Sequence, residues 1–313
     1  MEKIFCNLCG STKYKIFLNN VKSPEFEEEF TLVKCTRCGL IYLNPRPTKN
    51  HIGKYYSTPN FFSDFSDARG KYAFLYDMIF REIKSGKVFD IGAGTGLFLT
   101  EFKKGGWEVD GLEPSVIARR IAKKKFGINL KKEDVLDINF KDEYFDLVVL
   151  NNVIEHLYRP TETLKKVSRI VKKGGFVLIS CPNIKGMGPL LFRQKWYGMD
   201  TPRHLYQFCP ESLETILNHS EVKIFKISHN FYRHNYSVLF ESLRRTFSPR
   251  NSETRKSEKT LIKPNTGEKK SKQSLVTQVG IFACKVLSGG IALVEPLIGR
   301  GEIITVLVVK PNK

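Results

Sequence analysis

The stretch VFDIGAGTGLFLTEF, residues 88–102, decides the fold of this chain. An apolar run ends at Asp90, and the turn after it carries Gly92, Gly94 and Gly96 before a helix-like pattern begins. Glycine lets the backbone approach a ligand closely because it has no Cβ atom. Dinucleotide-binding folds need a third glycine three positions after the second, where this chain has leucine. The pattern therefore predicts a nucleotide-type ligand at the end of a parallel strand, and it disfavours NAD.

Strand-like and helix-like patterns alternate from residue 87 to about residue 232. Such alternation predicts an α/β fold, with a parallel sheet covered by helices on both faces. A last strand is expected near the carboxyl end, at 303–310. The other expected strands are 87–91, 107–113, 128–132, 145–150, 174–182 and 221–227, and the expected helices are 95–105, 115–125, 160–173, 211–218 and 236–247.

Composition divides the chain into five parts. The stretch 248–274 is polar and basic with few apolar residues, so we expect a disordered linker or an exposed loop there. The five parts are a cysteine-bearing module (1–45), an aromatic-rich connector or lid (46–85), the ligand-binding core (86–235), a helical insertion (236–300) and the final strand of the core (301–313).

Three later segments follow the glycine turn in an order that carries a resemblance to a known family. They are WEVDGLEPS (107–115), KKEDVLD (131–137) and FDLVVLNNVIEHL (145–157). With the Asp90 turn, they resemble the class I methyltransferases that use S-adenosylmethionine (SAM). The resemblance covers about residues 87–232 and the final strand, and it implies a Rossmann-like sheet of seven strands.

The resemblance also implies roles for single residues of a SAM site. Glu113 would accept hydrogen bonds from the ribose hydroxyls, as the acid of nucleotide-binding folds does. Asp134 would take the adenine amino group, with the backbone of Val135 against the ring. Asn151, which follows the fourth strand, would also bind the cofactor. A helix beginning near Thr95 would direct its N–H groups at the methionyl carboxylate.

Four of the seven cysteines form two C-x-x-C pairs, each followed by glycine: Cys6 with Cys9, and Cys35 with Cys38. Four thiolates at this spacing suit a closed tetrahedral Zn²⁺ site, which can substitute for a core in a short module. The segment CTRCGLIYLNPRPT resembles the zinc-binding segment at the amino terminus of methyltransferases of sugar and polysaccharide pathways. A zinc ribbon with a structural or substrate-presenting role is therefore predicted.

Two histidines and a glutamate are the candidate catalytic residues. Glu155 and His156 follow the fourth strand. His204 lies in DTPRHLYQFCPESL, which resembles a stretch that the sugar-pathway methyltransferases also carry. Neutral imidazole suits the removal of a proton from an acceptor hydroxyl near pH 7. Glu155 could act as a base, bind a metal or orient a histidine. Arg203 could contact a substrate phosphate, and helix-start, capping or ion-pair roles are the structural alternatives for these side chains.

A rival interpretation uses the same three residues. Small-RNA 2′-O-methyltransferases hold a divalent metal with E-x-x-E-H and a distant histidine, whereas this chain has Asn152 in place of the first glutamate. Losing one carboxylate weakens a site for a hard cation. A third alternative is a non-catalytic scaffold in which the zinc ribbon binds a partner, although the intact glycines and Glu113 speak against a degenerate pocket.

The chain is strongly basic, with 51 Lys and Arg against 32 Asp and Glu and a net charge of +19. This balance favours anionic partners such as phosphorylated acceptors, acidic lipids or nucleic acid. We expect a cytoplasmic protein, since MEKIFCNLCG lacks the apolar core of a signal peptide. Charged residues and a proline interrupt 279–299, which argues against a spanning helix. Contact of 236–300 with the inner face of the membrane stays open.

Taken together, these features predict a SAM-dependent methyltransferase that methylates, most simply on oxygen, a small-molecule, sugar or lipid-linked glycan acceptor. Nucleic acid is the less favoured partner, because no segment resembles an established RNA-binding module. Zinc would be the second, structural cofactor.

Overall fold

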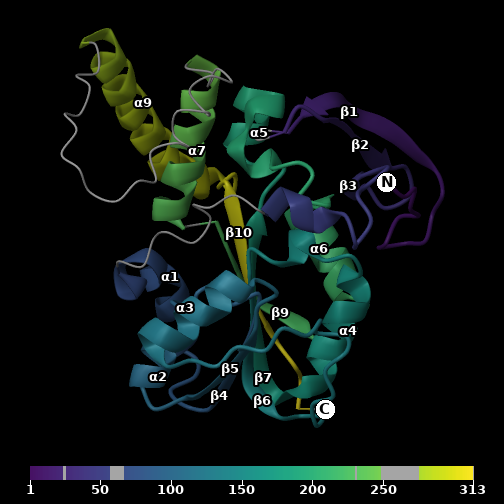
Figure 1. Ribbon diagram of the computed structural model, residues 1–313, viewed down its shortest axis with the longest axis vertical. Coiled ribbons are helices and arrows are strands. Elements are labelled where there is room, and N and C mark those ends of the chain that lie inside the picture. Colours follow the sequence, from purple (N-terminus) through teal and green to yellow (C-terminus); the bar gives the residue numbers. More distant parts are fainter. Residues whose placement is uncertain (24–25, 57–66, 230, 248–274, 313) are drawn as a thin grey trace.

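The computed structural model describes residues 1–313 apart from 24–25, 57–66, 230, 248–274 and 313. Its larger sheet runs through the centre of the molecule, and a smaller sheet lies beyond one end of it (Figure 1). The order of strands in the larger sheet is β5 (Glu108–Leu112), β4 (Lys87–Ile91), β6 (Phe145–Asn151), β7 (Val171–Pro182), β10 (Ile303–Val309) and β9 (Lys223–Ser228).

The centre of the larger sheet is parallel and its far side is antiparallel. β4 pairs in parallel with β5 and β6, and β6 pairs in parallel with β7. β10 returns antiparallel between β7 and β9. Val148 and Val149 of β6, whose side chains point to opposite faces, are both fully buried, as expected for a strand covered on both faces. The predicted α/β fold is confirmed.

Helices cover both faces of the larger sheet (Figure 1). On one side lie α1 (Ala68–Phe80), α2 (Leu99–Lys104) and α3 (Val116–Phe126), and on the other lie α4 (Pro160–Ile170) and α6 (Pro210–Leu217). Local sequence sets the ends of α3. The hydroxyl of Ser115 accepts a hydrogen bond from the Ala118 N–H, and Gly127 ends the helix with a left-handed φ of 61°.

Two elements predicted from the sequence differ from the structure. The strand expected at 128–132 is reduced to one bridge between Leu112 and Lys131, so the larger sheet has six strands among the described residues. Only Ile128 of this segment is buried, which leaves little apolar surface to hold a seventh strand at the edge. The helix expected at 160–173 ends at Ile170, and β7 begins directly after it.

The smaller sheet joins two distant parts of the chain. It has the order β1 (Tyr14–Lys22), β2 (Glu29–Cys35), β3 (Ile41–Leu43) and β8 (Tyr206–Gln207). β8 pairs antiparallel with β3, Ile41 opposite Gln207 and Tyr42 opposite Tyr206. The cysteine-bearing module therefore completes its sheet with a strand from the core.

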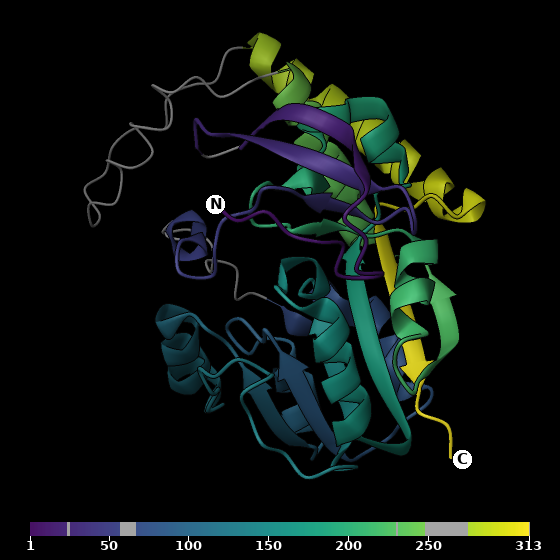
Figure 2. The same cartoon turned by 90° about the vertical axis from the view of Figure 1, so that its right-hand side faces the viewer.

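The helical insertion contains α7 (Tyr232–Phe247), α9 (Leu275–Val294) and the short helix η5 (Glu295–Ile298). α7 and α9 lie side by side in both views (Figures 1 and 2), and the linker predicted at 248–274 lies outside the described residues. By length and composition, Gly280–Ile298 could span a membrane, contrary to the sequence-based expectation, and 17% of it is buried in the protein. Its exposed side chains include Phe282, Leu293 and Leu297.

Candidate active site

The glycine turn lies where β4 ends, at the edge of the larger sheet. Asp90 is buried within β4, and Gly92, Gly94 and Gly96 have φ values of 73°, 54° and 75°. A Cβ atom on Gly92 would lie 2.6 Å from Cγ2 of Val153, so close packing as well as the left-handed backbone requires glycine there. The turn is thus shaped by its glycines, as predicted, and leaves the backbone open to a close ligand.

Glu113 follows β5 and braces this turn. Its Oε2 accepts a hydrogen bond from the Gly94 N–H at 2.9 Å, and its Oε1 accepts one from the Ser115 N–H at 2.7 Å. Each carboxylate oxygen has a second lone pair. Glu113 can therefore accept hydrogen bonds from ribose hydroxyls while it keeps its bonds to Gly94 and Ser115. Burial raises the pKa of Glu113, and burial together with the charge of Glu113 raises that of Asp90.

Asp134, Val135 and Asn151 complete the predicted cofactor set. Asp134 accepts an ion-paired bond from Lys49 at 2.7 Å and a second bond from the Leu136 N–H at 3.0 Å. Burial alone would raise the pKa of Asp134, but these two bonds outweigh burial and lower it. Val135 is buried, and Asn151 ends β6 beside β4. The bridge between Leu112 and Lys131 holds this segment beside Glu113.

The helix expected from Thr95 begins four residues later, because α2 starts at Leu99. Residues 95–98 form tight turns instead, with bonds from the Gly96 N–H to the Ala93 carbonyl and from the Leu99 N–H to the Gly96 carbonyl. The two left-handed glycines at 94 and 96 are incompatible with a continuous right-handed helix. The prediction that this helix begins near Thr95 is therefore wrong, and the proposed contact with the methionyl carboxylate stays a prediction.

Glu155, His156 and His204 come together although 48 positions separate the two histidines. Glu155 and His156 lie in the short helix η2 (Ile154–His156) after β6, and His204 precedes β8. A backbone bond from the Leu205 N–H to the Glu155 carbonyl, 2.8 Å long, joins the two segments. The two imidazole centres are 4.7 Å apart in an edge-to-face arrangement.

Backbone carbonyls fix the tautomer of each imidazole. Nδ1 of His156 lies 2.9 Å from the carbonyl oxygen of Arg203, and Nδ1 of His204 lies 2.8 Å from that of Gly198. Since a carbonyl can only accept, each Nδ1 carries the hydrogen and each Nε2 keeps a lone pair. Both Nε2 atoms lie 4.0 Å from Oε1 of Glu155, so two basic nitrogens and a carboxylate face one another.

A family model described as a methyltransferase domain matches residues 65–224, just over half of the chain. The chain belongs to this family. The matched residues contain β4 to β7 with the glycine turn, Glu113 and the Glu155, His156 and His204 cluster. The predicted enzyme class, a SAM-dependent methyltransferase, is thereby confirmed at the level of the family.

Curated relatives match a part of this methyltransferase. An uncharacterised protein of Methanocaldococcus jannaschii is 33% identical over 32% of this chain and 46% of its own length. An uncharacterised methyltransferase of Anoxybacillus flavithermus is 32% identical over 31% of this chain and 48% of its own length. A phosphatidylethanolamine N-methyltransferase of Cereibacter sphaeroides is 30% identical over 36% of this chain and 58% of its own length. The chain thus spans about half the length of these relatives.

Among solved structures, the cyclase SpnF superimposes with a TM-score of 0.54 at 15% identity. The alignment covers 86% of this methyltransferase and 99% of the cyclase. Identity this low shows a shared fold alone, because one fold serves many reactions.

Two further side chains of the methyltransferase site escaped the sequence analysis. Asp200 forms a bidentate pair with Arg203, at 2.6 and 2.9 Å, and its Oδ2 lies 3.7 Å from Nε2 of His204. The hydroxyl of Tyr56 lies 3.0 Å from Nδ1 of His156. The D-x-x-R-H spacing could have indicated Asp200, whereas Tyr56 is one aromatic residue among many. Arg203 thus forms an internal ion pair, the structural alternative to a phosphate contact.

Burial governs the protonation of the cluster. It raises the pKa of Glu155 to about 8. Burial and the neighbouring His204 lower the pKa of His156 to about 3. Burial also lowers the pKa of His204, against the attraction of Asp200. Both imidazoles are therefore neutral near pH 7, and each Nε2 keeps its lone pair.

The four predicted zinc ligands converge in the amino-terminal module. Sγ of Cys6 lies 3.4 Å from that of Cys38, Sγ of Cys9 lies 3.5 Å from that of Cys35, and all four atoms lie within 4.8 Å of one another. Thiolates around a tetrahedral Zn²⁺, each at roughly 2.3 Å, are about 3.8 Å apart. The four thiols therefore fit such an ion with small movements.

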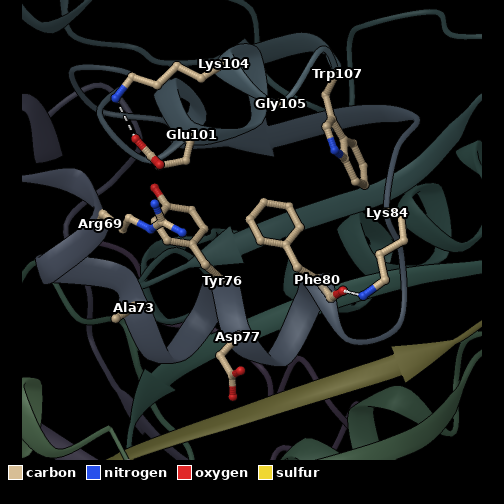
Figure 3. A pocket seen from close by; sticks show the side chains of 10 residues that line it. All are labelled: Arg69, Ala73, Tyr76, Asp77, Phe80, Lys84, Glu101, Lys104, Gly105 and Trp107. Carbon is tan, nitrogen blue, oxygen red and sulfur yellow. Dashed lines mark hydrogen bonds and ion pairs between the residues drawn. The ribbon is translucent and has the colours of Figure 1, made fainter.

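A groove lies away from these residues, between α1 and α2 (Figure 3). Its volume is about 710 Å³, and Tyr76, Phe80 and Trp107 form its apolar wall, with the Lys104–Glu101 ion pair on the rim. None of the predicted site residues lines it. Tyr76 stacks on Phe98 at 5.0 Å, so these aromatic side chains of the connector pack against the core.

Proposed function

We propose that this methyltransferase transfers the sulfonium methyl group of SAM to a hydroxyl oxygen of a sugar, nucleotide-sugar or lipid-linked glycan. The glycine turn with Glu113 and Asp134 would hold the cofactor at the ends of β4 and β5. The observation that carries the acceptor chemistry is the pair of Nε2 lone pairs of His156 and His204, beyond the end of β6.

In the proposed reaction, the acceptor oxygen attacks the methyl carbon in line with the carbon–sulfur bond. The new oxygen–carbon bond forms while that bond breaks, and S-adenosylhomocysteine leaves. The hydroxyl proton passes to Nε2 of His156 or His204, both uncharged near pH 7. Because the sulfonium is already activated, alignment of the two reactants supplies most of the acceleration.

Charge and resemblance support the acceptor class. Residues 186–313 carry 20 basic against 10 acidic residues, which favours an acceptor bearing phosphate. The amino-terminal segment resembles that of sugar-pathway methyltransferases, and zinc at its four cysteines would keep a structural role. We infer a cytoplasmic enzyme whose insertion contacts the inner face of the membrane. The phosphatidylethanolamine enzyme among the relatives makes an amine nitrogen the alternative acceptor atom.

Methyl transfer from labelled SAM into a host-cell extract, with half of each mixture treated with ribonuclease, tests the acceptor. We expect ribonuclease-resistant label in the small-molecule or organic-soluble fraction. Label that is in RNA-sized material and is released by ribonuclease would favour a metal-dependent RNA 2′-O-methyltransferase instead.

Calorimetric titration with S-adenosylhomocysteine tests the enzyme against the scaffold alternative. We expect saturable binding to the unmodified chain. Absence of heat at high micromolar ligand would favour a non-catalytic protein with a methyltransferase fold.

A further inference from the structure

We propose that Glu155, His156 and His204 together bind one divalent transition-metal ion beside the acceptor. The site is distinct from the four-cysteine cluster, and it needs no thiol. Metal binding is inferred from the geometry of the three side chains. The role of the metal in the reaction rests on the function proposed above.

The first observation is the carboxylate of Glu155. The residue is 1% exposed, and neither of its side-chain oxygens has a hydrogen-bond partner among the described residues. Burying a carboxyl group without a hydrogen-bond partner is unfavourable in either protonation state, so such groups are normally paired or coordinate a metal. Glu302, another buried carboxylate, accepts bonds from Gly188 and Trp196, so the lack of partners is specific to Glu155 in this comparison.

The second observation is the spacing of the three side chains. Nε2 of His156 and Nε2 of His204 each lie 4.0 Å from Oε1 of Glu155, and one ligand atom from each residue lies within 4.8 Å of the others. These gaps are too long for hydrogen bonds. Two atoms bound to the same ion, each at roughly 2.0–2.2 Å, are separated by about 3 to 4 Å. A small closure of the three side chains would therefore coordinate one ion.

The third observation is the orientation of the imidazoles. Histidines that bind a metal through Nε2 usually donate their Nδ1–H to a carbonyl or carboxylate, which fixes the ring and its tautomer. His156 donates to the Arg203 carbonyl and His204 to the Gly198 carbonyl, so both rings are held in this way without an ion. The Asp200–Arg203 pair supports the same loop.

The donor set indicates the class of metal. Two imidazole nitrogens and one carboxylate oxygen suit Mn²⁺, Fe²⁺, Co²⁺ or Zn²⁺ better than Mg²⁺ or Ca²⁺, which prefer oxygen ligands throughout. Three protein ligands leave coordination positions open, as catalytic sites require. The side chain of His156 is 23% exposed, so the site has access to solvent and to an acceptor.

With the ion bound, the imidazoles would be ligands and the acceptor hydroxyl would occupy an open position. An ion held by these residues would supply Lewis-acid chemistry by lowering the pKa of the hydroxyl, whose proton would then leave to water instead of to an imidazole. The oxygen–carbon bond would form as the carbon–sulfur bond breaks, and S-adenosylhomocysteine would depart.

Cobalt(II) titration of the metal-stripped full-length chain tests the proposal. Cobalt bound by the four cysteines shows intense thiolate charge-transfer absorption, whereas cobalt at Glu155, His156 and His204 shows ligand-field bands alone. We expect two equivalents of cobalt per chain, one of each kind. If all the cobalt bound by the wild-type chain shows thiolate absorption, the proposal is overturned. This result does not depend on whether any variant folds.

Three variants localise the second ion. Glu155→Gln, and independently His156→Ala with its partly exposed side chain, should weaken the thiolate-free cobalt by about 100-fold or more while sparing the thiolate-bound ion. Glu295→Gln removes a buried carboxyl outside the cluster and should retain both ions. Unchanged cobalt binding in both cluster variants would refute the assignment.

S-adenosylhomocysteine titration of the same samples separates this inference from the proposed function. Variants that lose cobalt and still bind S-adenosylhomocysteine are folded, so the loss belongs to the site. A wild-type chain that binds thiolate-free cobalt but no S-adenosylhomocysteine would overturn the proposed function and leave the metal site standing.

Discussion

The methyltransferase contains two clusters of potential metal ligands that differ in how the chain builds them. Cys6, Cys9, Cys35 and Cys38 come from one short segment, and their sulfur atoms pair at 3.4 and 3.5 Å. The cluster of Glu155, His156 and His204 combines two distant segments, and its nitrogens stand 4.0 Å from the carboxylate oxygen. The first cluster has four ligands for a closed site, and the second has three for an open one. Local spacing reveals the first kind of site, whereas tertiary structure creates the second.

The largest effect is expected in the cysteine cluster. Replacing Cys6 and Cys35 by serine should abolish zinc binding and lower the free energy of unfolding by several kcal/mol, because a small module depends on its metal for folding. Metal analysis and urea unfolding provide the measurement. Cys284→Ser, on α9, should change neither. Wild-type protein with far less than one zinc per chain would contradict the prediction.

Glu113→Ala should separate cofactor binding from both clusters. Loss of the bonds to the Gly94 and Ser115 N–H groups would loosen the glycine turn and remove the ribose acceptor. We expect S-adenosylhomocysteine affinity to fall by about 10- to 100-fold, equivalent to about 1.4–2.8 kcal/mol. Calorimetry would measure this, and Glu108→Ala at the exposed start of β5 is the control. Equal affinity in both variants would exclude Glu113 from the cofactor site.

His156→Ala and His204→Ala should each slow turnover by about 100-fold, since each removes a proton acceptor or a ligand beside the acceptor. Initial rates with the acceptor found by labelling would measure the effect. S-adenosylhomocysteine affinity should stay unchanged, and His219→Ala, on the surface, should keep full activity. Wild-type turnover in either cluster variant would remove that histidine from the mechanism.

Glu295 and Glu302 form a third buried cluster, which differs from the other two because it contains carboxyl groups without cysteines or histidines. Burial and the charge of Glu302 raise the pKa of Glu295, and burial raises that of Glu302. The folded state therefore binds more protons than the unfolded state above about pH 5, and the free energy of unfolding should fall as the pH rises. Between pH 6 and pH 9 we expect a loss of about 1–3 kcal/mol. Glu295→Gln should flatten this profile in urea unfolding, and equal profiles would contradict the prediction.

The smallest effect is expected at the exposed apolar side of α9. If this side lies on the inner membrane face, Phe282→Ser with Leu293→Ser should weaken cosedimentation with anionic lipid vesicles by about tenfold, and added salt should weaken it further. Both clusters should keep their ions. Phe225→Ser, an exposed apolar side chain on β9, is the control. Equal cosedimentation of all three proteins would exclude the α9 surface as the contact.

Sequence reasoning predicted well those features that local pattern controls. The glycine turn, the alternation of strands and helices and the converging cysteines all agree with the structure. It failed where neighbours decide: the segment 128–132 has too little apolar surface for a full strand, and left-handed glycines delay α2 to Leu99.

Distance along the chain limited the prediction of the candidate catalytic cluster. Glu155, His156 and His204 were identified as candidates, and the structure brings them together. Asp200 and Tyr56 were missed because their roles depend on contacts from other segments. Spacing could not reveal that both imidazoles would be fixed by carbonyls, or that Glu155 would be left without a donor.

The strand β8 belongs to the core by sequence but pairs with the sheet of the amino-terminal module. Its residues Tyr206 and Gln207 complete the small sheet, and Leu205 donates to Glu155 while its carbonyl accepts from the Leu43 N–H. Removal of the first 45 residues would leave an unpaired strand edge beside the candidate catalytic loop. A chain carrying a different amino-terminal module would therefore need a matching β3 strand to pair with β8.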